Sequence, residues 1–272
     1  MNELQRKLLS IIKYFDNFCE KHNIRYFLMG GSALGCARHK GFIPWDDDVD
    51  VFIPYKDYLE LIKYSSEISN DGFCLQQIKS QENGLYIGKL RLKGTFVAEN
   101  NKKLNPDICN GIFIDIMILF NSPNCLLSKI KMYVSAKILS ANSLLFTGYK
   151  TPSKFKRFFI KLSSHLVKRR GEDYFFKKIT RFSNSETKQV CHIFGRASFK
   201  NSFYKKEWFA SSTRMPFESL QLNMPIGFKD YLKRRYGKKY MEMPSQKIID
   251  SYPSHASYFN LDSDKDERQP RI

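Results

Sequence analysis

The sequence predicts an α+β fold in which a mixed sheet is flanked by helices. Apolar residues recur at helical spacing near the N-terminus, and short apolar runs typical of buried strands follow between further helical segments. The chain has 272 residues, 42% of them hydrophobic and 15% aromatic, which is enough to bury a sizeable core. We therefore expect a globular protein of one or two domains.

The first elements alternate between helix and strand. Residues 4–20 carry one apolar stripe and are predicted to form a helix that packs against the core. Residues 24–29 form a short apolar run that ends in glycines, so we expect a strand there. A glycine-rich turn should follow, and a second helix should begin at Leu34. The N–H groups of Gly30, Gly31 and Ser32 in such a turn can approach an anion.

Four carboxylates occupy five positions within residues 46–50. Like charges this close repel each other, so the arrangement is favourable if a cation lies among them. Side chains alternate along a strand, and Asp46, Asp48 and Asp50 would share one face of a strand predicted over residues 45–53. Such oxygen ligands suit Mg²⁺ (or Mn²⁺), and Mg²⁺ in proteins usually also binds phosphates. The alternative is a solvated acidic loop. The nearby glycine turn favours a site for phosphoryl-type transfer.

A helix is expected after Pro54, with three residues facing inward: Leu59, Ile62 and Ile68. Two more strands are expected, over residues 86–92 and 111–119. The first places Lys89 and Arg91 on the same face.

The second of these strands is apolar except for Asp115. A buried Asp is costly unless it is paired or bound to a metal. Backbone N–H groups could satisfy Asp115, but we favour a third carboxylate that lies beside Asp48 and Asp50.

The net charge of +18 would attract nucleic acid, anionic lipid or phosphate-bearing substrates. A helix is predicted after Pro152 with an apolar stripe along one face and basic residues along another. The apolar residues are Phe155, Phe158, Phe159, Leu162 and Leu166, and the basic ones are Lys154, Arg157, Lys161 and Lys168. Such a helix is typical of a membrane-surface element. The alternatives are a helix packed on the domain with a solvated basic face, or a nucleic-acid contact.

The six cysteines show no spacing that predicts a zinc site or a disulfide framework. No apolar stretch is long enough to span a membrane and no signal peptide is evident, so we expect a cytoplasmic protein. Near the C-terminus, a short helix within residues 225–240 should end at Gly237, and the tail from about residue 262 should be frayed.

Several segments resemble the LicD family, a branch of the nucleotidyltransferase-fold superfamily that includes bacterial phosphocholine transferases and animal fukutin-related proteins. The resemblance is strongest over residues 30–35 and over residues 38–50, which read Arg-His-Lys-Gly-Phe-Ile-Pro-Trp-Asp-Asp-Asp-Val-Asp. It recurs at residues 111–116 and returns in four places near the end of the chain: Tyr231-Leu232, Tyr236-Gly237, Tyr240-Met241 and His255. The middle of the chain is not diagnostic.

The resemblance implies metal-dependent transfer of a phosphorylated alcohol, such as phosphocholine, from a CDP-alcohol to a sugar hydroxyl. The acceptor would be a cell-surface glycan or a polyprenol-linked precursor. The catalytic residues implied are Asp48, Asp50 and Asp115, with Asp46 as a further metal ligand. Which of Asp46, Asp48 and Asp50 contacts the metal directly stays open. The substrate-binding residues expected are Gly30, Gly31, Ser32, Arg38, Lys89, Arg91 and His255.

The resemblance also implies a nucleotidyltransferase-like core over residues 1–121, a basic helical insertion over 122–215 and a C-terminal segment over 216–272 that completes the catalytic domain. We expect the protein to be peripheral on the inner face of the cell membrane, with no specific nucleic-acid partner. Three alternatives stay open: a nucleotidyltransferase that releases pyrophosphate from an NTP, a non-catalytic nucleic-acid-binding protein, and a catalytically idle membrane scaffold. The alcohol could be choline, ethanolamine, glycerol or ribitol.

Overall fold

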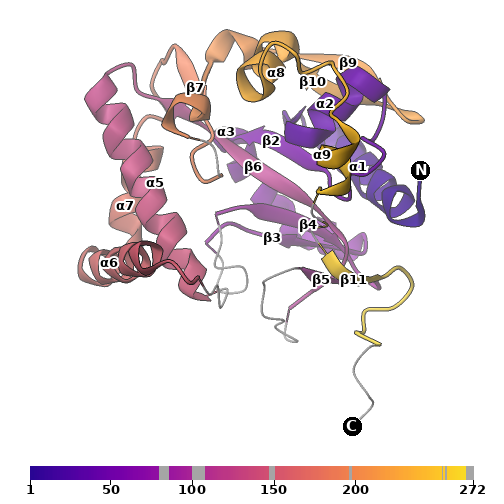
Figure 1. The fold of residues 1–272 in the computed structure, drawn as a ribbon, viewed down its shortest axis with the longest axis horizontal. Coiled ribbons are helices and arrows are strands. Elements are labelled where there is room, and N and C mark those ends of the chain that lie inside the picture. The colour runs from indigo at the N-terminus through magenta and orange to yellow at the C-terminus, as the bar shows by residue number, and fades with distance from the viewer. Residues whose placement is uncertain are drawn as a thin grey trace.

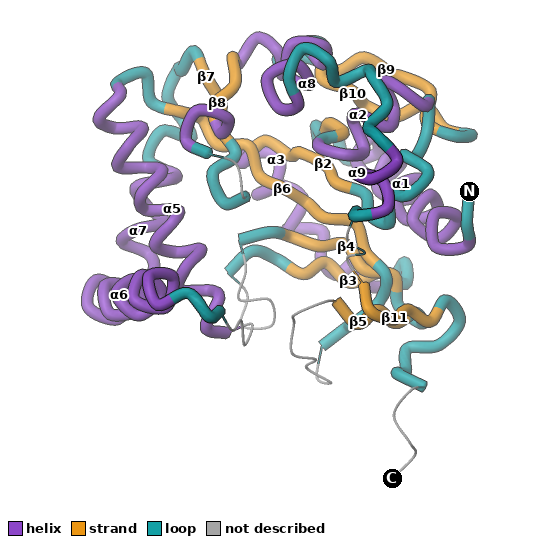
Figure 2. Tube along the Cα trace, in the orientation of Figure 1, coloured by secondary structure: helices purple, strands orange, loops and turns teal. Residues whose placement is uncertain are grey.

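A computed structural model describes residues 1–79, 86–99, 108–146, 151–195, 198–252, 254 and 256–267. Strands form a central sheet, and helices cover it, as Figure 1 shows. Three of the helices, α5, α6 and α7, pack on one another at one side of the molecule. Figure 2 shows this helical group in purple beside the orange strands of the sheet.

Nine α-helices and eleven strands are found in the described residues. The helices are α1 (Glu3–Lys21), α2 (Gly30–His39), α3 (Tyr55–Leu61), α4 (Ser65–Asn70), α5 (Leu126–Phe146), α6 (Lys154–Arg170), α7 (Glu172–Thr180), α8 (Phe228–Tyr236) and α9 (Gln246–Asp250). The strands are β1 (Phe27–Leu28), β2 (Asp50–Pro54), β3 (Phe73–Gln76), β4 (Gly88–Leu92), β5 (Phe96–Glu99), β6 (Phe113–Ser122), β7 (Gln189–Cys191), β8 (Phe203–Lys205), β9 (Ser212–Phe217), β10 (Leu220–Pro225) and β11 (Ala256–Asn260).

The main sheet has the strand order β1-β2-β6-β4-β3, and β7 and β8 extend it from the far end of β6. Strands β2 and β6 are parallel, whereas the other pairs are antiparallel. The sheet is therefore mixed, and the predicted α+β class is confirmed. Two small sheets accompany it, the β9–β10 hairpin and the β5–β11 pair.

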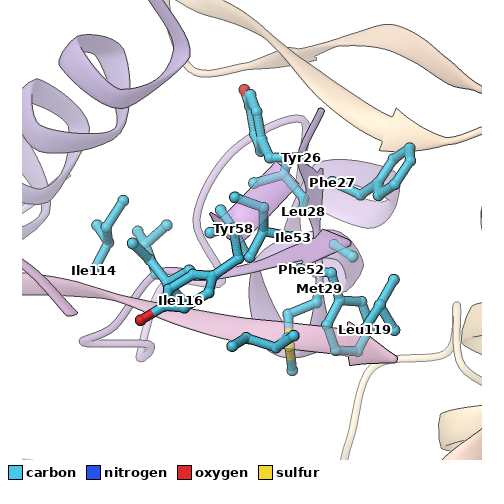
Figure 3. Close-up of a cluster of buried hydrophobic side chains, with 14 of the residues drawn as sticks. Tyr26, Phe27, Leu28, Met29, Phe52, Ile53, Tyr58, Ile114, Ile116 and Leu119 are labelled. Atoms are coloured by element: carbon cyan, nitrogen blue, oxygen red, sulfur yellow. The ribbon is translucent and has the colours of Figure 1, made fainter. Parts of the chain in front are cut away.

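The core lies between the sheet and the helices. Figure 3 shows a cluster of its apolar side chains around β1, β2 and β6. Along β6, Ile114, Ile116 and Ile118 are buried on one face because side chains alternate along a strand. The predicted N-terminal helix is confirmed as α1. It begins with a capping box formed by Asn2 and Gln5, which satisfies two backbone N–H groups at the helix start.

Three sequence predictions about the first elements were wrong. The strand expected from residue 45 begins only at Asp50, because Pro44 and Trp45 form a turn and residues 46–49 run as a loop. The side chain of Gln5 stabilises this loop by donating to the Asp46 carbonyl at 3.0 Å. The second helix begins at Gly30 rather than Leu34, so the expected glycine turn is the first turn of α2. Leu59 is 39% exposed and does not face inward.

The helix predicted after Pro152 is α6, which is capped by the Ser153 side chain. The face packed inward holds Ile160 and Ser163, so it lies beside the predicted Phe stripe rather than on it. Helix α8 ends at Gly237, as predicted. Among the described helices, none combines the length and apolar character needed to cross a membrane. The predicted tail falls partly on residues 268–272, which lie outside the described residues.

Candidate active site

Two of the predicted carboxylates meet at the centre of the sheet. Asp50 opens β2, and its partner in the parallel register with β6 is Asp115. The Asp115 N–H donates to the Val49 carbonyl at 2.9 Å, which fixes this register at the strand entry. Because side chains of paired residues point to the same face of a sheet, Asp50 and Asp115 share one face.

Asp48 lies in the loop before β2, where other carboxylates surround it. Removal from water raises the pKa of Asp48 well above its ordinary value, and so do the charges of Asp50 first and then Asp46, Asp115 and Asp47. The expectation that Asp46, Asp48 and Asp50 alternate along one strand face was wrong, because residues 46–49 form a loop. The loop nevertheless gathers the carboxylates around Asp48.

The glycines at the start of α2 let these carboxylates approach the backbone. Gly30 has φ +56°, and a Cβ placed there would lie 3.1 Å from Asp50 Oδ2. At Gly31, a Cβ would lie only 2.5 Å from Asp46 Oδ2, so any side chain there would force the Asp46 carboxylate to shift. Ser32 Oγ accepts a hydrogen bond of 2.9 Å from the Asp50 N–H. Residues 30–32 therefore pack directly against the acidic cluster.

The start of α2 is also electrostatically suited to an anion. The first N–H groups of a helix have no intrahelical partner, and the helix dipole places partial positive charge there. The Gly30 N–H is already used, because it donates to Tyr231 Oη at 2.9 Å. The N–H groups of Gly31 and Ser32 are the ones that suit a phosphate oxygen.

The two predicted basic residues of β4 form one network through Glu99. Lys89 Nζ lies 2.8 Å from Asp115 Oδ1 and 3.2 Å from Glu99 Oε2. Arg91 binds Glu99 Oε1 at 2.6 Å. Both cations also lie over the Phe113 ring, so they share one face of the strand as predicted.

Both cations are buried, but they differ in what surrounds them. Arg91 is 1% exposed, and it donates to Gln76 Oε1 and the Gly111 carbonyl as well as to Glu99. With these bonds Arg91 holds β3, β4 and β5 together. Lys89, in contrast, lines a cavity of about 170 Å³ together with Asp47, Asp48, Glu99 and Asp115. Two larger cavities, of about 310 and 990 Å³, contain none of the predicted site residues.

The C-terminal part of the chain contributes residues to which the sequence analysis assigned no role. Arg235 Nη2 and Tyr236 Oη of α8 would lie 3.7 and 3.9 Å from a Cβ at Gly30, so both reach the start of α2. Tyr252 Oη donates to Asp46 Oδ1 at 3.3 Å, and Ser254 Oγ donates to Asp47 Oδ2 at 2.9 Å. The Tyr-Gly motif at residue 236 was a signal for α8, but nothing in its spacing assigned a role to Arg235.

Arg38, a predicted substrate-binding residue, does not line this cavity. Arg38, near the end of α2, donates to the carbonyl of Glu242 at 3.0 Å and to that of Tyr240 at 3.4 Å. These bonds attach the C-terminal segment to α2. His255 lies outside the described residues.

The side chains that surround Asp48 are carboxylates, so the ligand atoms they offer a metal are oxygens. Mg²⁺ and Mn²⁺ prefer oxygen ligands. Within the described ranges, no group of three or more His, Cys, Asp or Glu side chains is arranged to hold a metal ion. Mg²⁺ is commonly held by one or two carboxylates plus substrate phosphates, and the pair Asp48 and Asp50 fits that mode.

Comparison with known proteins gives one family match and three similar proteins. Residues 23–103 match the family described as LicD/FKTN/FKRP, nucleotidyltransferase domain. The lipopolysaccharide cholinephosphotransferase LicD of Haemophilus influenzae is 26% identical over 94% of this chain and 96% of its own length. The human ribitol 5-phosphate transferase FKRP is 46% identical over 52 residues, which are 19% of this chain and 10% of that protein. Mannosyltransferase regulator 4 of Saccharomyces cerevisiae is 30% identical over 42% of this chain and 10% of its own length.

Proposed function

Because the chain belongs to the LicD family, we infer that it is a phosphotransferase that transfers a phosphorylated alcohol in the modification of a glycan. We further propose that the donor is a CDP-alcohol and that the reaction depends on Mg²⁺ or Mn²⁺. The acceptor would be a sugar hydroxyl of a surface glycan or of its polyprenol-linked precursor. One observation carries the proposal: Asp115 lines a cavity, its register partner Asp50 lies beside it, and the start of α2 packs against Asp50.

The protein must perform three tasks in this reaction, which follow from the bonds that form and break. The acceptor oxygen forms a bond to the phosphorus that carries the alcohol, and the bond from this phosphorus to the bridging oxygen of CMP breaks. The acceptor proton goes to a base, and CMP leaves with the bridging oxygen. The site must therefore accept a proton, stabilise charge on the transferred phosphoryl group and bind the leaving phosphate.

Asp115 is the residue placed to accept the proton. Its carboxylate lines the cavity, where it can accept the proton of an acceptor hydroxyl bound there. Lys89 also lines the cavity, so its ammonium group can offset negative charge on a phosphoryl oxygen there.

The leaving phosphate has a binding place at the start of α2. The Gly31 and Ser32 N–H groups and the Arg235 guanidinium surround this position, and each favours an anion. Asp48 and Asp50 would hold the metal ion, which when bound would neutralise diphosphate charge and so make CMP a better leaving group. The raised pKa of Asp48 supports a role for a cation here, because burial and the charges of neighbouring carboxylates both disfavour its ionised form.

The test is a panel of CDP-choline, CDP-ethanolamine, CDP-glycerol and CDP-ribitol with Mg²⁺ and a lipid-linked glycan extract. Chromatography of the nucleotides should show release of CMP with one alcohol preferred, and no release with EDTA. Parallel reactions with NTPs measure pyrophosphate. Pyrophosphate release without CMP release would instead assign a nucleotidyltransferase. Absence of turnover in every arm would refute the proposed donor.

A further inference from the structure

Helix α6 exposes large apolar side chains to solvent. Phe155 is 78% exposed, Phe158 64%, Leu162 42% and Phe159 39%. They fall on neighbouring turns of one helix, so they form a contiguous stripe. Soluble proteins rarely leave such patches uncovered, and a patch of this kind marks an interaction site. We name these four residues the α6 stripe.

The stripe is not the face by which α6 packs on the protein. Helix α6 contacts α5 and α7, and its buried residues are Ile160 and Ser163. Helix α5 adds a second run of exposed apolar residues at helical spacing: Leu127, Ile130 and Val134. Helices α5, α6 and α7 therefore pack on one another and still expose apolar side chains.

Basic residues flank the α6 stripe, with no acidic residue nearby in sequence. Lys154, Arg157, Lys161 and Lys168 are all exposed on α6. Among the residues that the structure describes, none of these four forms an ion pair. From Asn121 to Gly171 the chain contains neither Asp nor Glu. Such a surface is complementary to an extended anionic surface rather than to a partner with charges of both signs.

We propose that α6 lies in the headgroup region of an anionic lipid bilayer, with the α6 stripe inserted toward the acyl chains and the basic residues among the phosphates. Bulky apolar side chains next to Lys and Arg on one exposed helix are the features of an interfacial helix. Phe rings can stack on bases, but Leu162 and the exposed aliphatic residues of α5 cannot, so the apolar surface as a whole favours acyl chains over nucleic acid. This inference concerns a surface outside the carboxylate cluster and does not depend on the proposed chemistry.

The test is cosedimentation of the full chain with vesicles, without substrate or metal. Vesicles of phosphatidylglycerol and phosphatidylcholine should bind the protein, and pure phosphatidylcholine should bind it weakly. The triple variant Lys154→Glu, Arg157→Glu, Lys161→Glu should lower partitioning by roughly a hundredfold, since each basic residue contributes about fivefold. The variant Phe155→Ala, Phe158→Ala, Leu162→Ala should weaken the part of vesicle binding that persists at high salt. The expected loss in partitioning is roughly tenfold for each side chain removed.

Matched controls change exposed residues elsewhere. Lys13→Glu, Lys56→Glu, Lys206→Glu alters the same number of exposed charges, and Ile226→Ala, Met243→Ala, Ile248→Ala removes exposed apolar groups outside α6. Both controls should keep most of the vesicle binding, and melting curves should match across all variants. Equal losses in the control and α6 variants would overturn the proposal. Binding of single-stranded RNA that the α6 variants abolish, with vesicle binding absent, would overturn it too.

Discussion

Asp50 and Asp115 are register partners on the parallel strands β2 and β6, and they direct two carboxylates to one face of the sheet. Adjacent like charges on neighbouring strands destabilise a sheet. Here Lys89 binds Asp115 at 2.8 Å, and the start of α2 packs against Asp50. The sheet therefore holds the two carboxylates in different surroundings, one paired with a cation and the other facing a helix N-terminus.

Replacing Asp48 should separate function from stability. Asp48→Asn should abolish metal-dependent turnover, because it removes one of the two proposed metal ligands. Without metal, the variant should be more stable than the natural protein at neutral pH, because it relieves carboxylate repulsion. Initial rates with Mg²⁺ and melting curves in EDTA measure the two effects. Near-normal turnover would show that Asp48 is no ligand.

The sign of the pH dependence follows from the raised pKa of Asp48. The folded state binds this proton more tightly than the unfolded state does, so the Asp48 contribution to stability falls as pH rises above the ordinary carboxyl pKa. In EDTA, the stability difference between the Asp48→Asn variant and the natural protein should grow from acid toward neutral pH. Asp47→Asn, in the same loop, is the control and should show a smaller difference. An unchanging difference would contradict the raised pKa.

Replacing Asp115 tests its role as a base. Asp115→Ala should lower turnover by at least two orders of magnitude, because general-base catalysis contributes about 10²–10⁴-fold. Asp57 offers a structural comparison, since it is buried and pairs with Arg25 at 2.8 Å. Asp57→Asn should lose activity only in proportion to its lost thermal stability. The same proportionality for Asp115→Ala would assign Asp115 a structural role.

Adding one methyl group at Gly31 should displace Asp46. The Cβ of Gly31→Ala would lie 2.5 Å from Asp46 Oδ2, so that carboxylate must move. We expect a loss of turnover of at least tenfold with little change in melting temperature, because a side-chain end can shift while the backbone stays. Gly88→Ala is the control, since its Cβ would meet atoms at ordinary contact distance, with 3.4 Å the nearest. Unchanged kinetics in Gly31→Ala would remove Asp46 from the site.

Replacing Arg235 tests the proposed binding of the donor phosphate. Arg235→Met should lower kcat/KM for the CDP-alcohol by about 10²-fold, the usual effect of removing one donor to a developing charge. Arg235→Lys should recover part of it, because the charge is kept but the planar guanidinium is lost. Arg234→Met on the same helix is the control, because Arg234 donates to the Lys200 carbonyl instead. Equal kinetics in the two Met variants would exclude Arg235 from donor binding.

The sequence predicted the parts of the site whose chemistry is local. Carboxylates at residues 46–50 and a lone Asp115 in an apolar strand are unusual enough to identify without a structure. The structure differs from these predictions where contacts between residues distant in the sequence determine the local conformation. Gln5, some 40 positions earlier, donates to the Asp46 carbonyl, so a distant side chain takes the place of a strand partner at the start of the acidic loop.

The same reasoning explains what the sequence could not predict near the C-terminus. In the sequence, Arg235 looks like any basic residue of a surface helix. Its place beside α2 follows from the position of α8, which is shown by the hydrogen bond from the Gly30 N–H to Tyr231 Oη. Strand β11 pairs with β5 through a register that includes a bulge, so its sequence shows no clear alternation. Arg91 was expected to bind substrate because it shares a face of β4 with Lys89. Alternation predicts which face a side chain is on, but it does not predict which side chain on that face lines a cavity.

The contacts of Tyr252 with Asp46 and of Ser254 with Asp47 have a consequence for biosynthesis. A ribosome makes the acidic loop about 200 residues before it makes the side chains that cover it. During that interval the nascent chain carries a cluster of like charges without its C-terminal cover. Closure of such long-range contacts is slow compared with local folding. The acidic loop should therefore gain its cover late in synthesis, and a chain that stops before α8 should lack the Tyr252 and Ser254 contacts.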